Sequence, residues 1–366
     1  MSVCITTIVH DSSRLGGGIV NVARPLHTRL LALGAEAHFI SGNIPFENIP
    51  NTQVVGLNGQ GFASLKKNAV QPLVHIHGIW TPFEYRAFRE ARRRGALVVI
   101  SPHGALEPWA FRHKRVKKQV AWWLYQKRIL QGADLLVVNS TQEMERLRDL
   151  GLTPPIAIIP NGVDLQGFPR NGAERERIVL FFSRLVPKKG VLDLIDAWSA
   201  VDNRKGFRLH IHGHGDMAYT EKIEQRIEAC NSGDIALMPP VFGGARWDVF
   251  TKASVYVLPS YSENFGITVA EALTAGLPVI TTHATPWGEL SSEGLGWVVD
   301  NDVGQLRDAL QAAINLDASM LSAMRKKAQI YAGQRFGWDA IAEQYAETYR
   351  WISQPEKASP GWVDRR

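Results

Sequence analysis

Two acidic residues and a predicted helix start lie close together in the segment LPSYSENFGITVAEALTAGLPVI, residues 258–280. The pattern predicts a strand, then a polar loop, then a helix that begins near Gly266. Amides in the first turn of a helix have no partner within it, so those around Gly266 and Ile267 form an anion site suited to a phosphate. Glu263 and Glu271 could then meet a reacting sugar and a ribose, because a carboxylate accepts several hydroxyl hydrogen bonds. Alternatively, Glu271 only complements the helix dipole and Glu263 is an ordinary loop residue.

A second segment, SRLVPKKG at residues 183–190, brings two cations to the mouth of a predicted helix. Arg184 offers a fork that matches two phosphate oxygens, and Lys189 supplies a compact charge. Together they could stabilise the negative charge that grows on a departing diphosphate without a metal. The alternative is a basic loop on the surface.

Two histidine-rich strings lie at the ends of predicted strands: HIHG at residues 75–78 and HIHGHG at residues 210–215. Alternate residues of a strand point the same way, so each string could place two imidazoles on one metal, as in a metal-dependent hydrolase. Such a site needs further ligands from later strand ends, and no later pair stands out. We therefore favour histidines that end central strands, with Gly213 and Gly215 letting the backbone approach a nucleotide.

The elements that must position these residues follow an α/β pattern, because short runs rich in Val and Ile alternate with longer helical patterns. At 366 residues the chain exceeds the size at which one core keeps growing, so we expect two domains. The polar stretch 164–177 carries Gly and Pro and is the predicted linker. Strands are predicted near residues 4–10, 37–40, 73–77, 97–101, 135–139 and 156–159, and again near 178–182, 208–211, 255–258 and 278–281.

Basic residues are concentrated in the first half of the chain. The net charge is +6, but residues 1–165 contain 19 Lys or Arg against 11 Asp or Glu, a net +8. Seven of these cations lie in residues 111–130, which contain no acid. If this stretch is helical, four apolar residues share one side: Val116, Val120, Trp123 and Leu124.

We favour a packed stripe beneath a solvated basic face for this helix. The sharper hypothesis is contact with anionic lipid headgroups or with a phosphorylated acceptor. Nucleic acid is disfavoured, because no sequence of a nucleic-acid-binding motif accompanies the charge.

Composition points to a globular protein of a reducing compartment. The hydrophobic fraction is 45% and the charged fraction 21%, and no window is apolar enough to span a bilayer. Cys4 and Cys230 are too few and too far apart for a disulfide framework or a thiolate metal site. The opening MSVCITTIVHDSS lacks the basic head and cleavage site of a secretory signal, so we expect a cytoplasmic location.

Six segments carry a family resemblance, and their order and spacing are more specific than any one alone. They are RLGGGIV, PHGALEPWA, IPNGVD, SRLVPKKG, ENFGITVAE and FGWDAIAEQYAETYRWI. Together they resemble the retaining glycosyltransferases of family 4, the group 1 enzymes of polysaccharide or lipopolysaccharide biosynthesis, over nearly the whole chain. The resemblance implies the GT-B fold, an α/β architecture of two Rossmann-like domains whose parallel sheets face each other across a cleft. Its parts would be an acceptor-binding domain over 1–165, a nucleotide-sugar-binding domain over 166–335 and a helix within 336–366 that crosses back to the first domain.

The resemblance also implies a role for each matching residue of the second domain. Arg184 and Lys189 match the pair that binds the donor diphosphate. Glu271 matches the acid that holds the ribose, and Glu263 matches the acid beside the transferred sugar. Three residues would offer backbone amides to the donor: Asn264, Phe265 and Gly266.

In the first domain, Gly17 and Gly18 match a loop in which backbone without side chains approaches the phosphates or the acceptor. The glycines Gly16 to Gly18 are contiguous and no acid follows at the usual distance, so the dinucleotide fingerprint is absent and a hydride-transfer enzyme is disfavoured. His103 matches a histidine that similar enzymes place near the sugar. A loop histidine with a purely structural bond is the alternative.

The implied reaction is transfer of a hexosyl group from a UDP- or GDP-sugar to a hydroxyl group of a glycan or lipid-linked acceptor, with retention at the anomeric carbon. No metal and no other cofactor are expected. The basic segment 111–130 favours peripheral contact with the inner face of a membrane. Alternatives are a metal-dependent hydrolase built on the histidine strings, a non-enzymatic sugar-nucleotide binding module and a nucleotide-sugar epimerase of GT-B shape.

Overall fold

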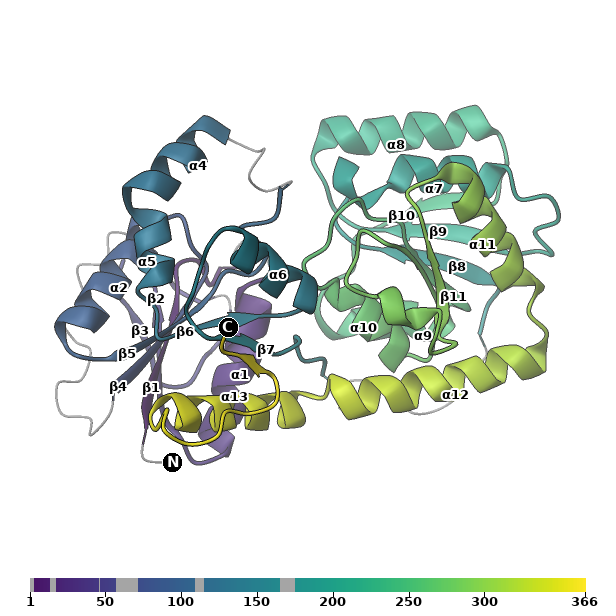
Figure 1. Cartoon of the computed structure of the whole chain (residues 1–366). Helices are drawn as coiled ribbons and strands as arrows, with labels where there is room; N and C mark the ends of the chain where they lie inside the picture. The colour runs from purple at the N-terminus through teal and green to yellow at the C-terminus, as the bar shows by residue number, and fades with distance from the viewer. Residues whose placement is uncertain (1–2, 14–17, 46, 57–71, 109–114, 165–174) are drawn as a thin grey trace. The chain divides into compact units, whose positions relative to one another are not determined.

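The structure is a computed structural model that describes residues 3–13, 18–45, 47–56, 72–108, 115–164 and 175–366. The chain forms two compact units (Figure 1). Unit 1 comprises Met1–Gly162 with Trp338–Arg366, and unit 2 comprises Val163–Gly337. Each unit has its own sheet and its own buried apolar core.

The sheet of unit 1 has the strand order β14-β7-β6-β5-β4-β1-β2-β3. Its pairs are parallel except that β14 runs antiparallel to β7 at the edge. The central strands are almost wholly buried, as expected for apolar runs covered on both faces. The strands are β1 (Cys4–Val9), β2 (Glu36–Ser41), β3 (Thr52–Val54), β4 (Pro72–His77), β5 (Leu97–Ser101), β6 (Leu135–Val138), β7 (Ile156–Ile158) and β14 (Val363–Asp364).

Helices cover both faces of this sheet. One face carries α1 and α13, whose apolar residues share a core with β1, and the other carries α2, α6 and a continuous helix over 115–131. The start of α2 shows local control by sequence, because Thr81 and Glu84 form a capping box around Pro82. The helices are α1 (Val20–Ala32), α2 (Pro82–Arg93), α4 (Arg115–Ala121), the π-helical turn η2 (Trp122–Gln126), α5 (Lys127–Gln131), α6 (Thr141–Asp149) and α13 (Trp338–Ile352).

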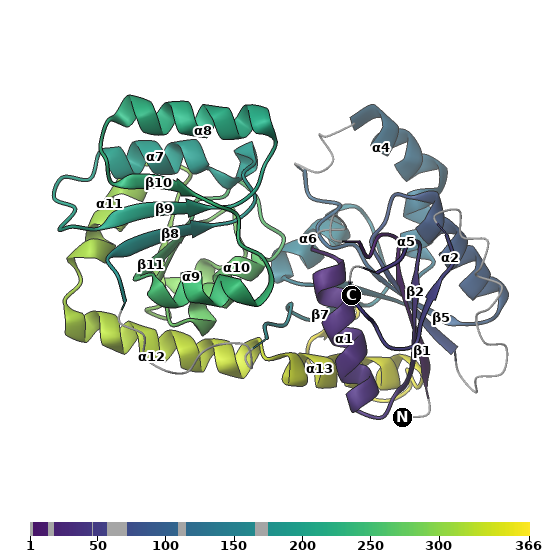
Figure 2. The same cartoon turned by 180° about the vertical axis from the view of Figure 1, so that it is seen from behind.

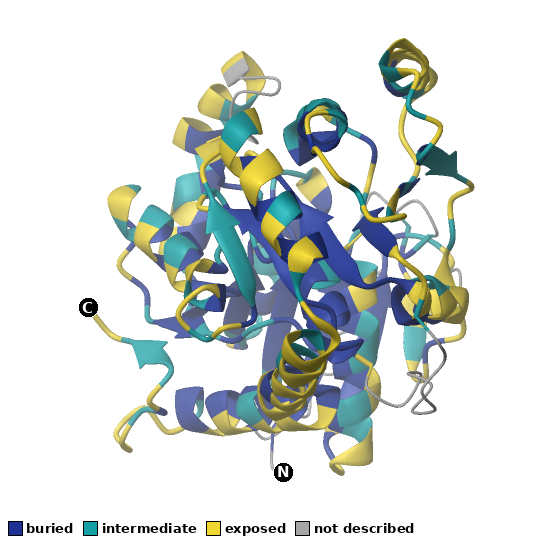
Figure 3. Cartoon of the chain, turned by 90° about the vertical axis from the view of Figure 1, so that its right-hand side faces the viewer, coloured by how far each residue is buried: buried dark blue, intermediate teal, exposed yellow. Residues whose placement is uncertain are grey.

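The sheet of unit 2 is parallel throughout, with the order β10-β9-β8-β11-β12-β13. The order reverses direction between β8 and β11, and doubly wound sheets bind ligands beside such a point. Figure 3 shows the strands mostly buried and the helices alternately buried and exposed. The strands are β8 (Ile178–Phe182), β9 (Arg208–His212), β10 (Ile235–Met238), β11 (Val255–Leu258), β12 (Val279–Thr282) and β13 (Gly296–Val299).

Helices also cover both faces of the second sheet. Figures 1 and 2 show α7 and α8 side by side on one face, where α11 also packs on α7, and α10 with α12 on the other. The helices are α7 (Val191–Ser199), α8 (Met217–Cys230), α9 (Arg246–Lys252), α10 (Ile267–Thr274), α11 (Val303–Asn315) and α12 (Ala318–Arg335), with 3₁₀ turns η3 (Pro187–Lys189), η4 (Gly243–Ala245) and η5 (Gly288–Leu290).

The chain passes between the units twice, and the two passages lie side by side. Val163 pairs with Gly337 in an isolated parallel bridge. A side chain at Gly162 would overlap the ring of Trp338, so the IPNGVD segment needs glycine there. The structure divides the chain after residues 162 and 337, where the sequence suggested 165 and 335. Most of the predicted linker, residues 165–174, lies outside the described residues.

The predicted α/β fold of two parallel sheets is confirmed, and each predicted strand is observed within about two residues. Four short strands were not predicted: β3, β10, β13 and β14. The closing helix appears as α13, which begins at Trp338 after a break that follows α12. Within the described part of the chain, no helix has both the length and the apolarity of a membrane span.

The packed stripe predicted for the basic helix is wrong. The exposed fractions are 72% for Val116, 53% for Val120, 75% for Trp123 and 67% for Leu124. The helix instead buries its opposite side, formed by Trp122, Gln126, Ile129 and Leu130. The helix has two apolar faces, and the face that packs into the core is not the predicted one.

Candidate functional site

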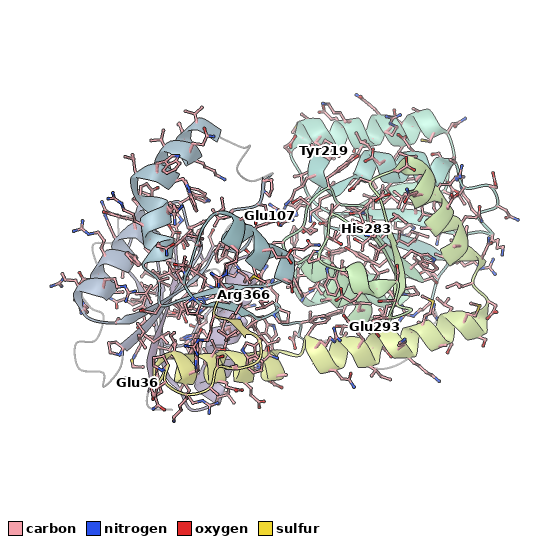
Figure 4. All side chains as sticks on the ribbon, viewed as in Figure 1. Glu36, Glu107, Tyr219, His283, Glu293 and Arg366 are labelled. Atoms are coloured by element: carbon pink, nitrogen blue, oxygen red, sulfur yellow. The ribbon has the colours of Figure 1, made fainter. Side chains whose placement is uncertain are left out.

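The loops that follow β8 and β11 meet at the carboxyl edge of unit 2, because these two strands are neighbours in the sheet. Gly190 has φ +69°, and a side chain there would overlap the carbonyl oxygen of Pro259 in the second loop. The amide of Tyr261 donates to the carbonyl of Lys188 at 2.8 Å. His283, labelled in Figure 4, follows β12 on the same edge. The arrangement brings the two segments predicted to bind a donor into direct contact.

The contact centres on a buried ion pair between Lys189 and Glu263. Their exposed fractions are 6% and 7%, and the hydroxyl of Ser260 donates to Oε1 of Glu263 at 3.0 Å. Burial lowers the pKa of Lys189, and the charge of Glu263 works in the opposite direction. A buried ion pair of this kind costs desolvation energy, so it is a weak stabiliser but a firm way to fix two charged groups.

The second predicted cation, Arg184, is exposed. Its side chain forms no hydrogen bond or ion pair with another residue in the described ranges, yet its positive charge contributes to lowering the pKa of Lys189. The two cations therefore lie within electrostatic reach of each other. One is fixed and paired, and the other is available to a ligand.

The loop after Glu263 ends at a constrained helix start. Gly266 precedes α10 with φ +76°, a conformation that favours glycine. Phe265 is buried against the rings of Trp287 and Phe336, and the indole N–H of Trp287 donates to the carbonyl of Phe265. Asn264 lies between Glu263 and this anchor and is half-buried. The packing holds the first amides of α10 at the carboxyl edge. Trp287 was not predicted as part of the site.

Glu271 is the second predicted acid of the site, and it is buried on α10 with an exposed fraction of 6%. Nε of Arg246 donates to its Oε1 at 2.8 Å. Burial raises the pKa of Glu271, and the Arg246 charge opposes that shift. Arg246 was not predicted as a site residue, because it lies 25 residues before Glu271 and no local pattern links them.

In unit 1, His103 follows β5 and stacks on His77 at the end of the neighbouring strand β4. Nδ1 of His77 lies 3.0 Å from Nε2 of His103, and the rings are nearly parallel. The side chain of Asn139 also hydrogen-bonds His103. Burial lowers the pKa of His103 to about 4, so the ring is neutral at physiological pH. Its φ of +52° is unusual for a residue with a side chain and marks a constrained position.

The other histidine of this string, His75, is fixed by protein groups. Its Nδ1 lies 2.6 Å from the hydroxyl of Tyr349 and its Nε2 lies 2.8 Å from Oγ of Ser101. Burial lowers the pKa of His75 to about 3. Both ring nitrogens are therefore engaged without a metal.

Among the described residues, one group of three possible metal ligands comes together, formed by Cys4, Glu36 and His38. It contains no member of either histidine string. In the second string, Nδ1 of His212 lies 3.2 Å from the carbonyl oxygen of Pro239. These positions give no support to a metal centre built on the strings.

Four glycines were predicted to let the backbone approach a ligand, and the structure describes three of them. Gly18 is exposed before α1, and Gly17 lies outside the described residues. Side chains at Gly213 and Gly215 would overlap the carbonyl oxygens of Ser183 and Leu185. The structure thus explains these two glycines by the close approach of the chain that follows β8.

Solved structures of the same shape define the class of fold. Sucrose-phosphate synthase from Thermosynechococcus elongatus is 21% identical with a TM-score of 0.76, and the match covers 96% of this chain and 99% of that one. HepE of Anabaena, solved in complex with UDP and glucose, is 19% identical with a TM-score of 0.73, covering 94% and 99%. The chain therefore has the GT-B fold.

Family models match almost the whole chain. The model of glycosyltransferase family 4 matches residues 16–166, and that of the group 1 glycosyl transferases matches residues 166–331. The chain belongs to glycosyltransferase family 4.

The curated relatives match only part of this chain and share less than 30% of the residues there. D-inositol 3-phosphate glycosyltransferase of Kineococcus radiotolerans is 28% identical over 64% of this chain and 61% of that protein. In two related enzymes of the same name the chain spans only a little over half of their length, 55% and 54%. GDP-mannose:cellobiosyl-diphosphopolyprenol alpha-mannosyltransferase of Xanthomonas oryzae is 28% identical over 76% of this chain and 73% of that protein.

Proposed function

We propose that the chain transfers a hexosyl group from a UDP- or GDP-sugar to a hydroxyl group of a glycan or lipid-linked acceptor, with retention at the anomeric carbon. The observation that carries this proposal is the joining of the two predicted donor loops through the buried pair of Lys189 and Glu263. A paired lysine and acid beside a helix start suit a sugar diphosphate better than a hydride donor or a nucleic acid.

The residues of unit 2 divide the donor between them in this proposal. Lys189 and Arg184 bind the diphosphate and stabilise its charge as it leaves. Lys189 does so as a buried, paired side chain and Arg184 as an exposed one. Glu263 meets the transferred sugar, and Glu271 accepts from the ribose. The amides of Asn264, Phe265 and Gly266 contact the donor at the start of α10.

The residues of unit 1 act on uncharged groups. Gly17 and Gly18 let the backbone approach the donor or the acceptor, and neutral His103 hydrogen-bonds a sugar hydroxyl. The bond from the anomeric carbon to the diphosphate oxygen breaks, and the acceptor oxygen bonds to that carbon on the same face. The acceptor proton passes to the leaving phosphate, so no metal and no protein nucleophile is required.

The acceptor is proposed to be an intermediate of cell-surface polysaccharide or lipopolysaccharide synthesis. The Xanthomonas relative, whose name specifies a diphosphopolyprenol acceptor, supports a lipid-linked substrate. With such an acceptor, the proposed location is the cytoplasm, at the inner face of the membrane.

The helix over 115–131 supports a peripheral membrane contact, proposed for residues 111–130. Its exposed apolar row holds Trp123, a residue suited to the boundary between lipid and water. Lys117 is exposed beside that row, and seven cations with no acid fit an anionic headgroup layer.

Vesicle sedimentation tests this contact. We expect the protein to bind vesicles that contain phosphatidylglycerol at low salt, and Trp123→Ser with Leu124→Ser to weaken binding by at least about tenfold, since full burial of one apolar side chain contributes roughly 1.5–3 kcal/mol and about 1.4 kcal/mol is a factor of ten. Ile330→Ser on α12, also an exposed apolar residue, is the matched control. Equal binding by all three proteins, or none by the wild type, would refute the contact.

The transfer itself is tested by product analysis with UDP- and GDP-sugars and a polyprenyl diphosphate glycan, with and without chelator. We expect a glycosylated acceptor, released UDP or GDP, and activity that survives chelation. Loss of activity with chelator would favour the metal hydrolase. A changed sugar still attached to its nucleotide would identify an epimerase, and donor binding with no turnover would identify a binding module.

A further inference from the structure

Arg246 is fixed from three sides at the start of α9. Its Nε donates to Oε1 of Glu271 at 2.8 Å, and its Nη1 donates to the carbonyl of Gly243 at 2.7 Å. The guanidinium carbon lies 5.1 Å from the ring centroid of Trp247. A guanidinium held in this way loses little further freedom when it orients a neighbouring group.

Glu271 needs such a partner because of where it lies. It is buried on α10, and Ala270 and Ala272 beside it are fully buried. Burial favours the protonated carboxyl group, whereas the charge and hydrogen bond of Arg246 favour the carboxylate. Arg246 therefore favours a carboxylate that accepts hydrogen bonds at this position over a neutral acid.

The geometry of the pair leaves part of the carboxylate available. Arg246 reaches Oε1 of Glu271 through Nε, not both oxygens through a fork. A carboxylate offers about four lone-pair directions, so Oε2 can accept from further donors while Oε1 is held. The ion pair both favours the ionised form of Glu271 and fixes the orientation of its carboxylate.

We propose that Arg246 is a positioning residue for ribose recognition: it holds the Glu271 carboxylate so that Oε2 accepts the ribose hydroxyls of the nucleotide. This inference rests on the proposed function, in which Glu271 meets the ribose. Arg246 acts through Glu271 and makes no direct contact with the nucleotide.

Two rival roles give different results. An Arg246 that binds the diphosphate or the base directly would contribute equally to ribonucleotides and deoxyribonucleotides. An Arg246 that only joins α9 to α10 would contribute to the melting temperature and not to the choice of sugar.

The test is calorimetric titration of the full chain with UDP and 2′-deoxy-UDP, and with GDP and 2′-deoxy-GDP. We expect the wild type to prefer the ribonucleotide of one pair, and Glu271→Gln to lose about tenfold of that preference, the scale of a hydrogen bond to a charged group. Arg246→Gln should lose the preference to a similar degree, with a smaller loss of affinity for the deoxynucleotide, which keeps one of the two ribose hydroxyls. The double variant should lose no more than Glu271→Gln alone, because the two residues form one unit.

Two controls keep the result interpretable. Arg226→Gln removes an arginine that pairs with Asp196 at 3.4 Å in the same unit, and it should leave the preference intact. Arg246→Lys keeps a positive charge and should retain most of the preference if Arg246→Gln is too unstable to titrate.

The outcomes separate the inference from the function beneath it. Loss of preference in Glu271→Gln but not in Arg246→Gln would overturn the role of Arg246 alone. Equal weakening of both nucleotides by Arg246→Gln would replace that role with direct contact. An unchanged preference in both variants would overturn the ribose assignment of Glu271 as well.

Discussion

The two units share one strand order over six of their strands, but the candidate site residues at their carboxyl edges differ in charge. In unit 1 the edge carries imidazoles that hydrogen-bond uncharged partners, with His103 on His77 and His75 between Ser101 and Tyr349. In unit 2 the edge carries buried charges in pairs. The pairs are Lys189 with Glu263 and Arg246 with Glu271.

Burial explains why each edge is stable with its own chemistry. A buried imidazole can avoid the cost of charge by staying neutral, and the pKa of His75 falls to about 3. The ammonium of Lys189 is held with a counter-charge, because a buried charge without a partner would cost far more free energy. An edge of neutral imidazoles suits sugar hydroxyls, whereas an edge with fixed charges suits a diphosphate.

The largest expected effect tests the charged edge. Lys189→Met leaves Glu263 buried without its counter-charge and should lower the free energy of unfolding by about 3–5 kcal/mol. Removing both charges in Lys189→Met with Glu263→Leu should recover most of that loss. Denaturant titration measures both, with Lys252→Met on the exposed side of α9 as the control. A single variant as stable as the wild type would show that the pair is not buried.

Arg184 provides the next effect, because it is the exposed member of the cationic pair. Arg184→Ala should reduce kcat by about 10²–10³-fold, the usual result of removing one donor to a developing negative charge. Stability should change by less than about 0.5 kcal/mol, as for most surface substitutions. Steady-state kinetics and melting curves provide the comparison, with Arg226→Ala as the control. Turnover like that of the wild type would remove the diphosphate mechanism.

Local sequence was sufficient for the central strands of both sheets and for the helix start near Gly266. Runs of Val and Ile predicted each long strand, since burial on both faces demands them. Gly190 and Gly266 both have a positive φ, which favours glycine. The position of Glu263 just before the helix start could be read directly from the sequence. β10 and β13 are edge strands with mostly half-buried residues, so they do not show the buried run that marks the central strands.

Long-range contacts were beyond the sequence. Arg246 and Trp287 each meet the site through a side chain from another element, and no spacing rule predicts such a meeting. The basic helix shows the same limit, because Trp122 and Trp123 are adjacent and only the fold decides which one is buried. The functional roles assigned to the site residues remain predictions that the variants must test.

Stability measured at several pH values tests whether the buried imidazole of His75 is neutral in the folded chain. His75 has a folded-state pKa of about 3, below its ordinary 6.5, so below pH 6.5 the unfolded chain takes up a proton that the folded chain refuses. Stability is therefore lost as pH falls from about 6.5 towards 3, with a slope near 1.4 kcal/mol per pH unit for this histidine. Denaturant midpoints at pH 7, 6 and 5 for the wild type and His75→Gln should show a shallower loss in the variant. Equal slopes would mean that the imidazole is charged in the folded state.

The smallest expected effect concerns His103, whose ring is neutral and already bonded to His77 and Asn139. A neutral hydrogen bond contributes about 0.5–1.5 kcal/mol, so His103→Asn should lower kcat/KM by roughly two- to tenfold. Steady-state kinetics at pH 7 and pH 8 should give the same ratio, because the ring does not titrate there. A loss of several hundredfold, or one that varies between these pH values, would make His103 an acid or a base and would end the contrast between a neutral and a charged edge.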